Sequence, residues 1–103
     1  IDDAGALRDI VEKPGAGHPL VRQAEHWVSM NLWSFTPRFF EACARVKPSE
    51  RGELELQAAV MIAMRELGEV FGVLRAHEGV LDLSRRADVA TIADFLRHVT
   101  VAP

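Results

Sequence analysis

Polar and aromatic side chains alternate over residues 25–35. Ser29 and Asn31 stand between Trp27 and Trp33, each two positions from the next. Residues two apart share one face of a strand, so the alternation predicts a strand with these four side chains on one side. Aromatic rings stack on the apolar faces of sugars, and hydroxyl and amide groups bond sugar hydroxyls. The pattern indicates a sugar site at Ser29 and Asn31, and the alternative is a half-buried strand whose tryptophans only pack.

A second pair of chemically capable residues, Glu12 and Lys13, precedes Pro14. The apolar residues just before the pair predict a short strand over 7–11 that ends there. Taken alone, adjacent acidic and basic residues before a proline are typical of a solvated strand end.

A short loop and the helix after it form the centre of the chain. Pro48 and Gly52 predict a rigid loop over 47–55, because Pro48 fixes φ and Gly52 permits positive φ. An apolar stripe then predicts a helix from Leu56 to Leu67 that ends at Gly68. Its members are Leu56, Ala59, Val60, Ala63, Met64 and Leu67. Two carboxylates, Glu53 and Glu55, would lie at the helix N-terminus.

The other segments predict further strands and helices. Thr36 and Pro37 indicate a helix start, with Phe39, Phe40, Cys43 and Val46 on the apolar side. Strands are expected over 70–76 and 80–83, before a last helix capped by Ser84. That helix would bury Val89, Ile92, Leu96 and Val99. We therefore expect one α/β domain over residues 1–103, with a mixed sheet and flanking helices.

Composition narrows the functional classes. A net charge of −3 over 103 residues argues against a nucleic-acid partner, because such proteins usually carry a basic face. The longest apolar run, 58–64, is far shorter than the roughly 20 residues of a membrane span. Cys43 is the single cysteine, which fits a reducing, cytoplasmic location, and the four histidines lack zinc-ligand spacing.

Four segments together resemble one known family. Residues 47–56 read KPSERGELEL and resemble the "KPSxRGELEITD" motif of the sugar-1-phosphate nucleotidyltransferases, which include glucose-1-phosphate thymidylyltransferase and mannose-1-phosphate guanylyltransferase. Residues 11–14 resemble the family's "EKP" motif. Residues 29–33 resemble its "N-T/S-G-I/L-Y/F" strand, and residues 79–84 resemble its "G-x-W-x-D-x-G-T" segment. The resemblance runs from Val11 to about Leu96.

The resemblance implies roles for individual residues. Glu12 would contact sugar hydroxyls, and Lys13 would contact the phosphate of a sugar 1-phosphate. Ser29, Asn31 and Asp82 would line the sugar pocket. Ser29 stands where many members have Asn, and Asn31 where most have Gly, so the pocket is altered. The implied fold is the C-terminal half of a Rossmann-like nucleotidyltransferase domain.

The magnesium position departs from the family pattern. The motif ends in an Asp that ligates catalytic Mg²⁺, and Ala58 stands there in this chain. Three explanations compete: a neighbouring residue takes over as ligand, an Asp of the N-terminal half acts alone, or the protein is catalytically silent. Our hypothesis is the first, with Glu55 or Gln57 as the replacement ligand.

The resemblance implies transfer of a nucleoside monophosphate from a nucleoside triphosphate to a sugar 1-phosphate, with release of pyrophosphate. The family's Gly-rich phosphate loop does not occur among these residues. We therefore expect this chain to be part of a longer enzyme and to be inactive alone. A missing N-terminal half would bind the nucleoside triphosphate. The resemblance does not identify the catalytic residues. The alternative is a catalytically silent sugar-phosphate-binding or dimerisation module, because an exposed strand edge favours a homodimer.

Overall fold

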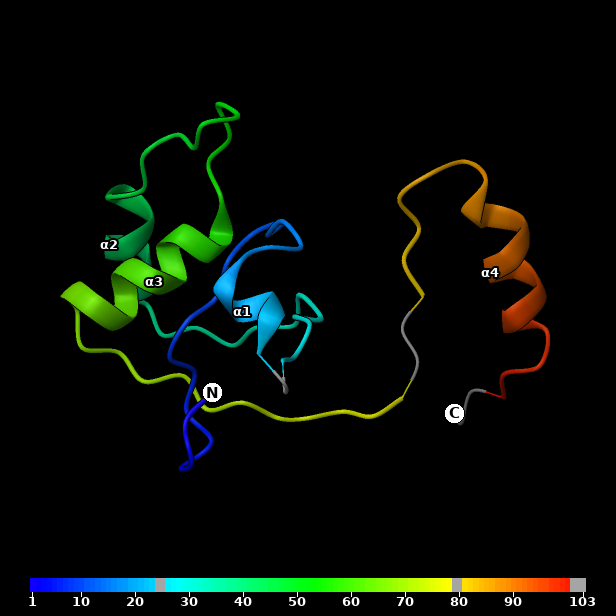
Figure 1. The fold of residues 1–103 in the computed structure, drawn as a ribbon, viewed down its shortest axis with the longest axis horizontal. Coiled ribbons are helices and arrows are strands. Elements are labelled where there is room, and N and C mark those ends of the chain that lie inside the picture. Colours follow the sequence, from blue (N-terminus) through cyan, green and yellow to red (C-terminus); the bar gives the residue numbers. More distant parts are fainter. Residues whose placement is uncertain (24–25, 79–80, 101–103) are drawn as a thin grey trace.

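The computed structural model describes residues 1–23, 26–78 and 81–100 of the chain. Within these residues it contains four helices and no strand (Figure 1). They are α1 (Pro19–Arg22), α2 (Phe39–Ala44), α3 (Leu56–Glu66) and α4 (Asp88–Leu96). None of the helices in the described ranges is long and apolar enough to cross a membrane.

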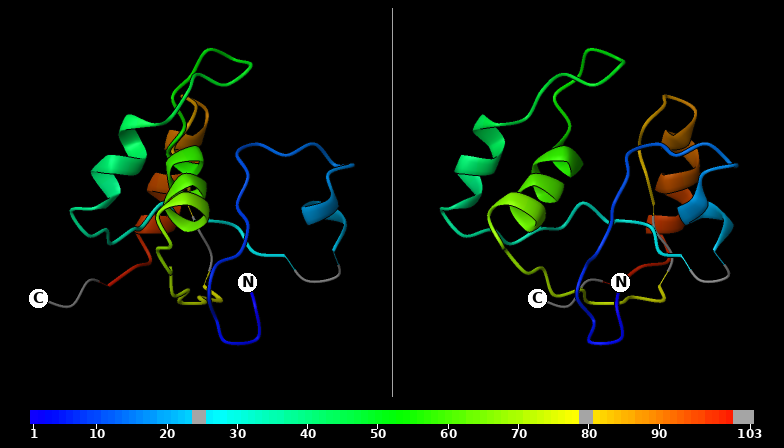
Figure 2. Two further views of the ribbon diagram at one scale, coloured as in Figure 1. Left: turned by 90° about the vertical axis from the view of Figure 1, so that its left-hand side faces the viewer. Right: turned by 60° about the vertical axis from the view of Figure 1, so that its left-hand side comes forward.

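The core lies between α2 and α3, which run side by side in both views of Figure 2. Each helix contributes small or branched residues to a buried contact, as the apolar stripe of α3 predicts. The buried residues are Phe39, Ala42, Ala59, Val60, Ala63 and Leu67. Val60 is fully buried and is the largest such side chain. The predicted central helix is thus confirmed, and four of the six residues of the expected stripe are buried in this core.

Glycine terminates α3 as the sequence predicts. Gly68 has φ 68°, a left-handed conformation that costs glycine little because it has no Cβ. The chain folds back there, so that the Glu69 N–H donates to the Ala63 carbonyl at 2.9 Å. Helix α2 begins later than expected: the Phe39 N–H closes a turn onto the Thr36 carbonyl at 3.0 Å, and the helix starts at Phe39.

The N-terminal segment meets the segment after α3. Leu7 donates its N–H to the Phe71 carbonyl at 2.8 Å, and Val73 donates to Gly5 at 2.9 Å. These two bonds make one isolated antiparallel bridge, Ala6 to Gly72. A turn at Asp2 precedes the bridge, and its carboxylate accepts the N–H of Ala6 at 2.9 Å.

The predicted mixed α/β sheet is wrong for the described residues. The segments 7–11, 26–35, 70–76 and 81–83 form no strands, and residues 25 and 80 lie outside the described ranges. A strand is stabilised by hydrogen bonds and side-chain pairs with a neighbour, which its own sequence cannot supply. Within residues 1–23, 26–78 and 81–100, strand pairing is limited to the single bridge between Ala6 and Gly72. The Rossmann-like architecture inferred from the resemblance is therefore not what these residues form.

Residues 26–35 show why alternation alone misleads. Asn31 has φ 54°, which interrupts an extended conformation. Val28 and Leu32, on the face of the predicted strand opposite the tryptophans, are 80% and 91% exposed, so no layer covers that face.

The last helix also differs from expectation. It begins at Asp88, with Ala87 and not Ser84 as the N-cap residue. The Asp88 carboxylate accepts the N–H groups of Ser84 at 3.3 Å and Arg85 at 2.9 Å, in the turn that precedes the helix. Helix α4 lies apart from α2 and α3 in Figure 1 and buries none of its residues. The predicted burial of its apolar stripe is wrong, and so is that of Phe40 and Cys43 on α2, which are exposed.

Candidate functional site

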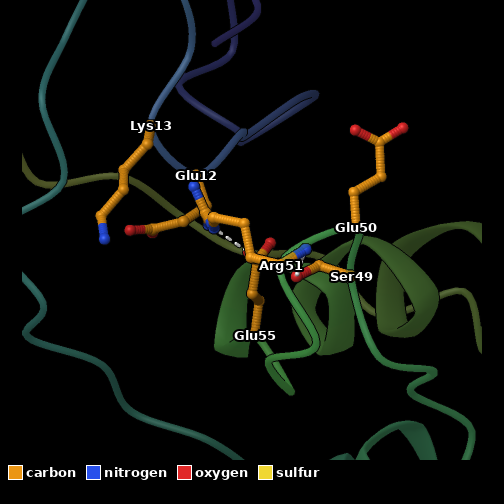
Figure 3. Close-up of a pocket in the computed structure, with 6 residues that line it drawn as sticks. All are labelled: Glu12, Lys13, Ser49, Glu50, Arg51 and Glu55. Carbon is orange, nitrogen blue, oxygen red and sulfur yellow. Dashed lines mark hydrogen bonds and ion pairs between the residues drawn. The ribbon is translucent and has the colours of Figure 1, made fainter.

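A pocket of about 260 Å³ gathers side chains from two distant parts of the sequence (Figure 3). Glu12 and Lys13 reach it from the segment before α1, and the others come from the loop before α3 and the start of that helix. The lining residues are Glu12, Lys13, Ser49, Glu50, Arg51 and Glu55. Every lining side chain is polar, so the pocket suits a charged or hydroxyl-bearing ligand.

The loop before α3 is a compact turn centred on Gly52. The Ser49 hydroxyl accepts the N–H of Arg51 at 3.3 Å and that of Glu53 at 3.4 Å. Main-chain bonds of 2.8 Å join Ser49 to Gly52 and Ser49 to Glu53. Gly52 has φ 74°, which confirms the predicted positive φ. The turn fixes the backbone from which Arg51 extends.

Arg51 lies between two carboxylates. Its guanidinium donates a hydrogen bond to Glu55 and approaches Glu53 at 3.8 Å. The Glu55 side chain is 19% exposed and that of Arg51 is 41% exposed. Glu55 is the N-cap residue of α3, where the helix dipole favours a negative charge. The arginine is therefore held at the helix N-terminus by a partly shielded ion pair.

Glu12 and Lys13 face the same pocket from a separate segment of the chain, as Figure 3 shows. Lys13 is exposed and has φ 45°, while Glu12 is half-buried. Together the lining carries three carboxylates (Glu12, Glu50, Glu55) and two cations (Lys13, Arg51), which leaves one net negative charge. A ligand that carries both hydroxyl donors and an anionic group would find a partner for each in this lining.

The other predicted sugar ligands do not line this pocket. Ser29 and Asn31 are exposed, and the Ser29 hydroxyl accepts the Asn31 N–H at 3.3 Å. Asp82 is exposed and accepts a hydrogen bond from the Ser84 hydroxyl near α4. The structure thus brings Glu12 and Lys13 together with Glu55, and leaves Ser29, Asn31 and Asp82 elsewhere. Their sugar-binding role stays a prediction.

The two tryptophans have different surroundings. Trp33 stacks on Phe35 with ring centroids 5.7 Å apart and meets Phe71 edge-on at 6.0 Å. It is half-buried against the core, as the packing alternative holds. Trp27 instead lies beneath the Arg75 guanidinium at 5.3 Å, with His77 at its edge. The two rings therefore do not form one stacking platform.

The predicted metal ligands do not form a metal site by themselves. Glu55 is paired with Arg51, and Gln57 lies in the first turn of α3 outside the pocket lining. Nowhere in residues 1–23, 26–78 and 81–100 do three or more His, Cys, Asp or Glu side chains come together as a metal-holding group. Mg²⁺ needs an octahedral set of oxygen ligands, and a carboxylate held by a guanidinium is a poor member of one.

Sequence reasoning missed three lining residues, namely Ser49, Glu50 and Arg51. All three belong to the 47–56 segment that resembles the family motif, so the signal was present in the sequence. A polar residue in a turn is usually solvated, and only the approach of Glu12 and Lys13 makes this turn one wall of a pocket.

Comparison with known proteins finds a similarity over most of the chain. Over 87 residues, which are 84% of this chain, the sequence is 30% identical to the UTP–glucose-1-phosphate uridylyltransferase AglF of Haloferax volcanii. The match covers 33% of that protein, so the chain spans about a third of the length of this curated relative. No protein-family profile matches the chain, and no solved structure matches it. The similarity to AglF confirms the resemblance of this chain to the sugar-1-phosphate nucleotidyltransferases.

Proposed function

We propose that this chain supplies the sugar-phosphate side of a sugar-1-phosphate nucleotidyltransferase. The observation that carries the proposal is the meeting of two motif segments at one polar pocket. Glu12 and Lys13 come from the "EKP" segment, and Ser49, Arg51 and Glu55 come from the "KPSxRGELE" segment. Two segments that resemble one family independently, and that also share a pocket, are better explained by a shared ligand than by coincidence.

The pocket residues receive distinct roles in this proposal. The half-buried Glu12 carboxylate accepts hydrogen bonds from sugar hydroxyls. Lys13 neutralises the phosphate as a point charge, and the Arg51 guanidinium offers a fork that can hold two phosphate oxygens. Because Arg51 and Lys13 line one pocket, a single phosphate group could be held between them.

The proposed reaction is a displacement at phosphorus. An oxygen of the sugar phosphate forms a bond to the α-phosphorus of a nucleoside triphosphate. The bond from that phosphorus to the bridging oxygen breaks, and pyrophosphate leaves with the bonding electrons. Phosphoryl-type transfer of this kind depends mainly on positioning and charge neutralisation. This chain contributes the positioning of the attacking sugar phosphate.

In our proposal the nucleotide-binding part of the active site lies outside residues 1–103. A Gly-rich loop elsewhere in the polypeptide holds the nucleoside triphosphate, and the 103-residue chain alone does not turn over. Magnesium would neutralise the triphosphate, with ligands drawn mainly from phosphates and from that other part. A cytoplasmic location also belongs to the proposal, since nucleoside triphosphates are the donors.

Binding of glucose 1-phosphate tests the proposal, because the similar protein from Haloferax volcanii is named for that sugar phosphate. The chain has two lysines, Lys13 in the pocket lining and Lys47 outside it, and both are exposed. We expect Lys13→Ala to weaken binding about tenfold, as loss of a charge-assisted contact does, and Lys47→Ala to leave the affinity within about twofold. Isothermal titration measures both.

Equal effects of the two lysine substitutions, or no binding of glucose 1-phosphate to the unsubstituted chain, would contradict the proposed sugar-phosphate site. Turnover is tested on the polypeptide as its source cell makes it, by pyrophosphate release from UTP and glucose 1-phosphate. A polypeptide that binds the sugar phosphate and releases no pyrophosphate with any nucleoside triphosphate would refute the enzyme and leave the second candidate.

That second candidate is a sugar-phosphate-binding or dimerisation module without chemistry. It is favoured by the exposed apolar side chains of α4, since Val89, Phe95 and Leu96 are each more than half exposed. A homodimer would raise the mass measured by light scattering as the concentration increases. A monomer mass that is constant over that range speaks against dimerisation.

A further inference from the structure

The Arg51 guanidinium, which the proposed site needs for a phosphate, is already engaged. It donates to Glu55, and both side chains line the same pocket as Lys13. Glu55 is 19% exposed and Arg51 is 41% exposed, so the carboxylate of this ion pair is partly shielded from solvent and the guanidinium is open to it. A phosphate entering the pocket therefore competes with Glu55 for Arg51.

The rest of the lining strengthens that competition. Three carboxylates against two cations leave the pocket with a net negative charge, which opposes a dianion. A ligand that is only an anion must displace Glu55 and gains nothing from Glu12. A ligand that also carries hydroxyl groups can donate hydrogen bonds to the carboxylates, which then attract it.

We propose that Glu55 is a specificity-determining residue that competes for Arg51 and so makes the pocket discriminate against anions without hydroxyl groups. This inference rests on the proposed function, because it concerns the same pocket. Specificity of this kind comes from an unfavourable interaction with the wrong ligand as much as from contacts with the right one. Both ligands displace Glu55 from Arg51, but the hydroxyls of a sugar phosphate then bond to the Glu12 carboxylate and to the displaced Glu55 carboxylate. Inorganic phosphate gives Glu55 no such replacement partner.

The size of the effect follows from the strength of the pair. Exposed ion pairs alter an equilibrium by about 1.5- to 5-fold, and the partial shielding of Glu55 places this pair at the upper end. We expect Glu55→Gln to bind inorganic phosphate about three- to fivefold more tightly than the unsubstituted chain does. Glucose 1-phosphate should gain less, because Glu55→Gln also removes a carboxylate acceptor for its hydroxyls, so the discrimination in its favour should fall.

A matched control separates competition for Arg51 from simple removal of charge. Glu50 also lines the pocket, and in Figure 3 its carboxylate points away from Arg51. Glu50→Gln removes the same charge without touching the ion pair, so we expect phosphate affinity to rise less than about twofold. In the double variant Arg51→Gln/Glu55→Gln the gain should disappear, because the cation that Glu55 withheld is gone.

The experiment titrates the full 103-residue chain and these variants with inorganic phosphate and with glucose 1-phosphate, at low ionic strength, by NMR chemical shifts. Thermal unfolding of each variant shows whether α3 is retained. We expect α3 to be retained in Glu55→Gln, because the Glu55 side chain makes no capping hydrogen bond. The inference is supported by a gain in phosphate affinity for Glu55→Gln that exceeds the gain for Glu50→Gln, needs Arg51 and exceeds the gain in glucose 1-phosphate affinity. Equal phosphate gains for the two variants, no gain for Glu55→Gln, or an equal gain for both ligands overturns it.

The two proposals fail in different ways. If glucose 1-phosphate does not bind the unsubstituted chain, the proposed function fails, while the phosphate titrations still decide whether Glu55 withholds Arg51. If glucose 1-phosphate binds through Lys13 and Glu55→Gln leaves phosphate affinity unchanged, the proposed function stands and the role of Glu55 is refuted.

Discussion

The guanidinium of Arg51 lies against the carboxylate of Glu55, and this contact joins the turn at Gly52 to the N-cap residue of α3. Arg51 belongs to the turn and Glu55 to the N-terminal end of α3, so the ion pair couples the position of the turn to that of the helix. Any change that disturbs the turn should therefore alter the pocket, because Arg51 and Ser49 both line it.

Replacement of Gly52 by alanine tests this coupling. The residue has φ 74°, where a Cβ costs about 1 kcal/mol, and an added Cβ would meet no atom within 4 Å. The cost is therefore conformational and not steric. We expect Gly52→Ala to lower the free energy of unfolding by about 1 kcal/mol in urea denaturation and to weaken sugar-phosphate binding.

Gly15→Ala is the matched control, because Gly15 has no positive φ and its Cβ would also enter open space. This variant should unfold like the unsubstituted chain. Equal destabilisation by the two substitutions would show that the backbone conformation at Gly52 has no special cost.

The contact between α2 and α3 should carry much of the stability. Val60 is fully buried between these helices, and truncation to alanine removes two methyl groups and leaves a cavity. We expect Val60→Ala to lower the free energy of unfolding by about 2 kcal/mol in chemical denaturation. Val89→Ala on α4 removes the same atoms from a side chain that is 53% exposed, and should cost much less.

The turn at Asp2 makes the N-terminal segment sensitive to acid. The Ala6 N–H and the Arg8 guanidinium both donate to the Asp2 carboxylate, and these bonds hold its pKa below the usual aspartate value. A lowered pKa means that the unfolded chain binds the proton more readily. The stabilisation is thus complete above the unfolded value of about 3.9 and is lost as the pH falls through the folded value.

An NMR titration of the carboxyl groups measures this directly. We expect Asp2 to titrate at a lower pH in the folded chain than in the urea-unfolded chain, and the Leu7 N–H to lose protection from hydrogen exchange as Asp2 is protonated. Titration of Asp2 at the same pH in the folded and unfolded chains would remove the basis for an acid-sensitive turn.

Local patterns predicted the central part of the chain well. The 3.6-residue stripe from Leu56 identified α3, Gly52 has the positive φ that the prediction allowed, and the helix ends before Gly68 as predicted. These features depend on neighbours within a few residues, such as the main-chain bonds of the turn and the periodicity of the helix. The "EKP" and "KPSxRGELE" segments are likewise continuous in the sequence, and they contain all the residues that meet at the pocket.

Features that depend on contacts between distant segments of the chain were decided by the tertiary structure. The alternation in residues 26–35 was compatible with a strand, and no neighbouring strand forms in the described residues to pair with it. The apolar stripe of α4 was correctly predicted as periodic, and it buries none of its residues. Helices and turns form hydrogen bonds within their own segment, so the sequence by itself determined them. Strand pairing, burial and the meeting of Lys13 and Arg51 at one pocket need contacts between distant segments, which only the folded chain supplies.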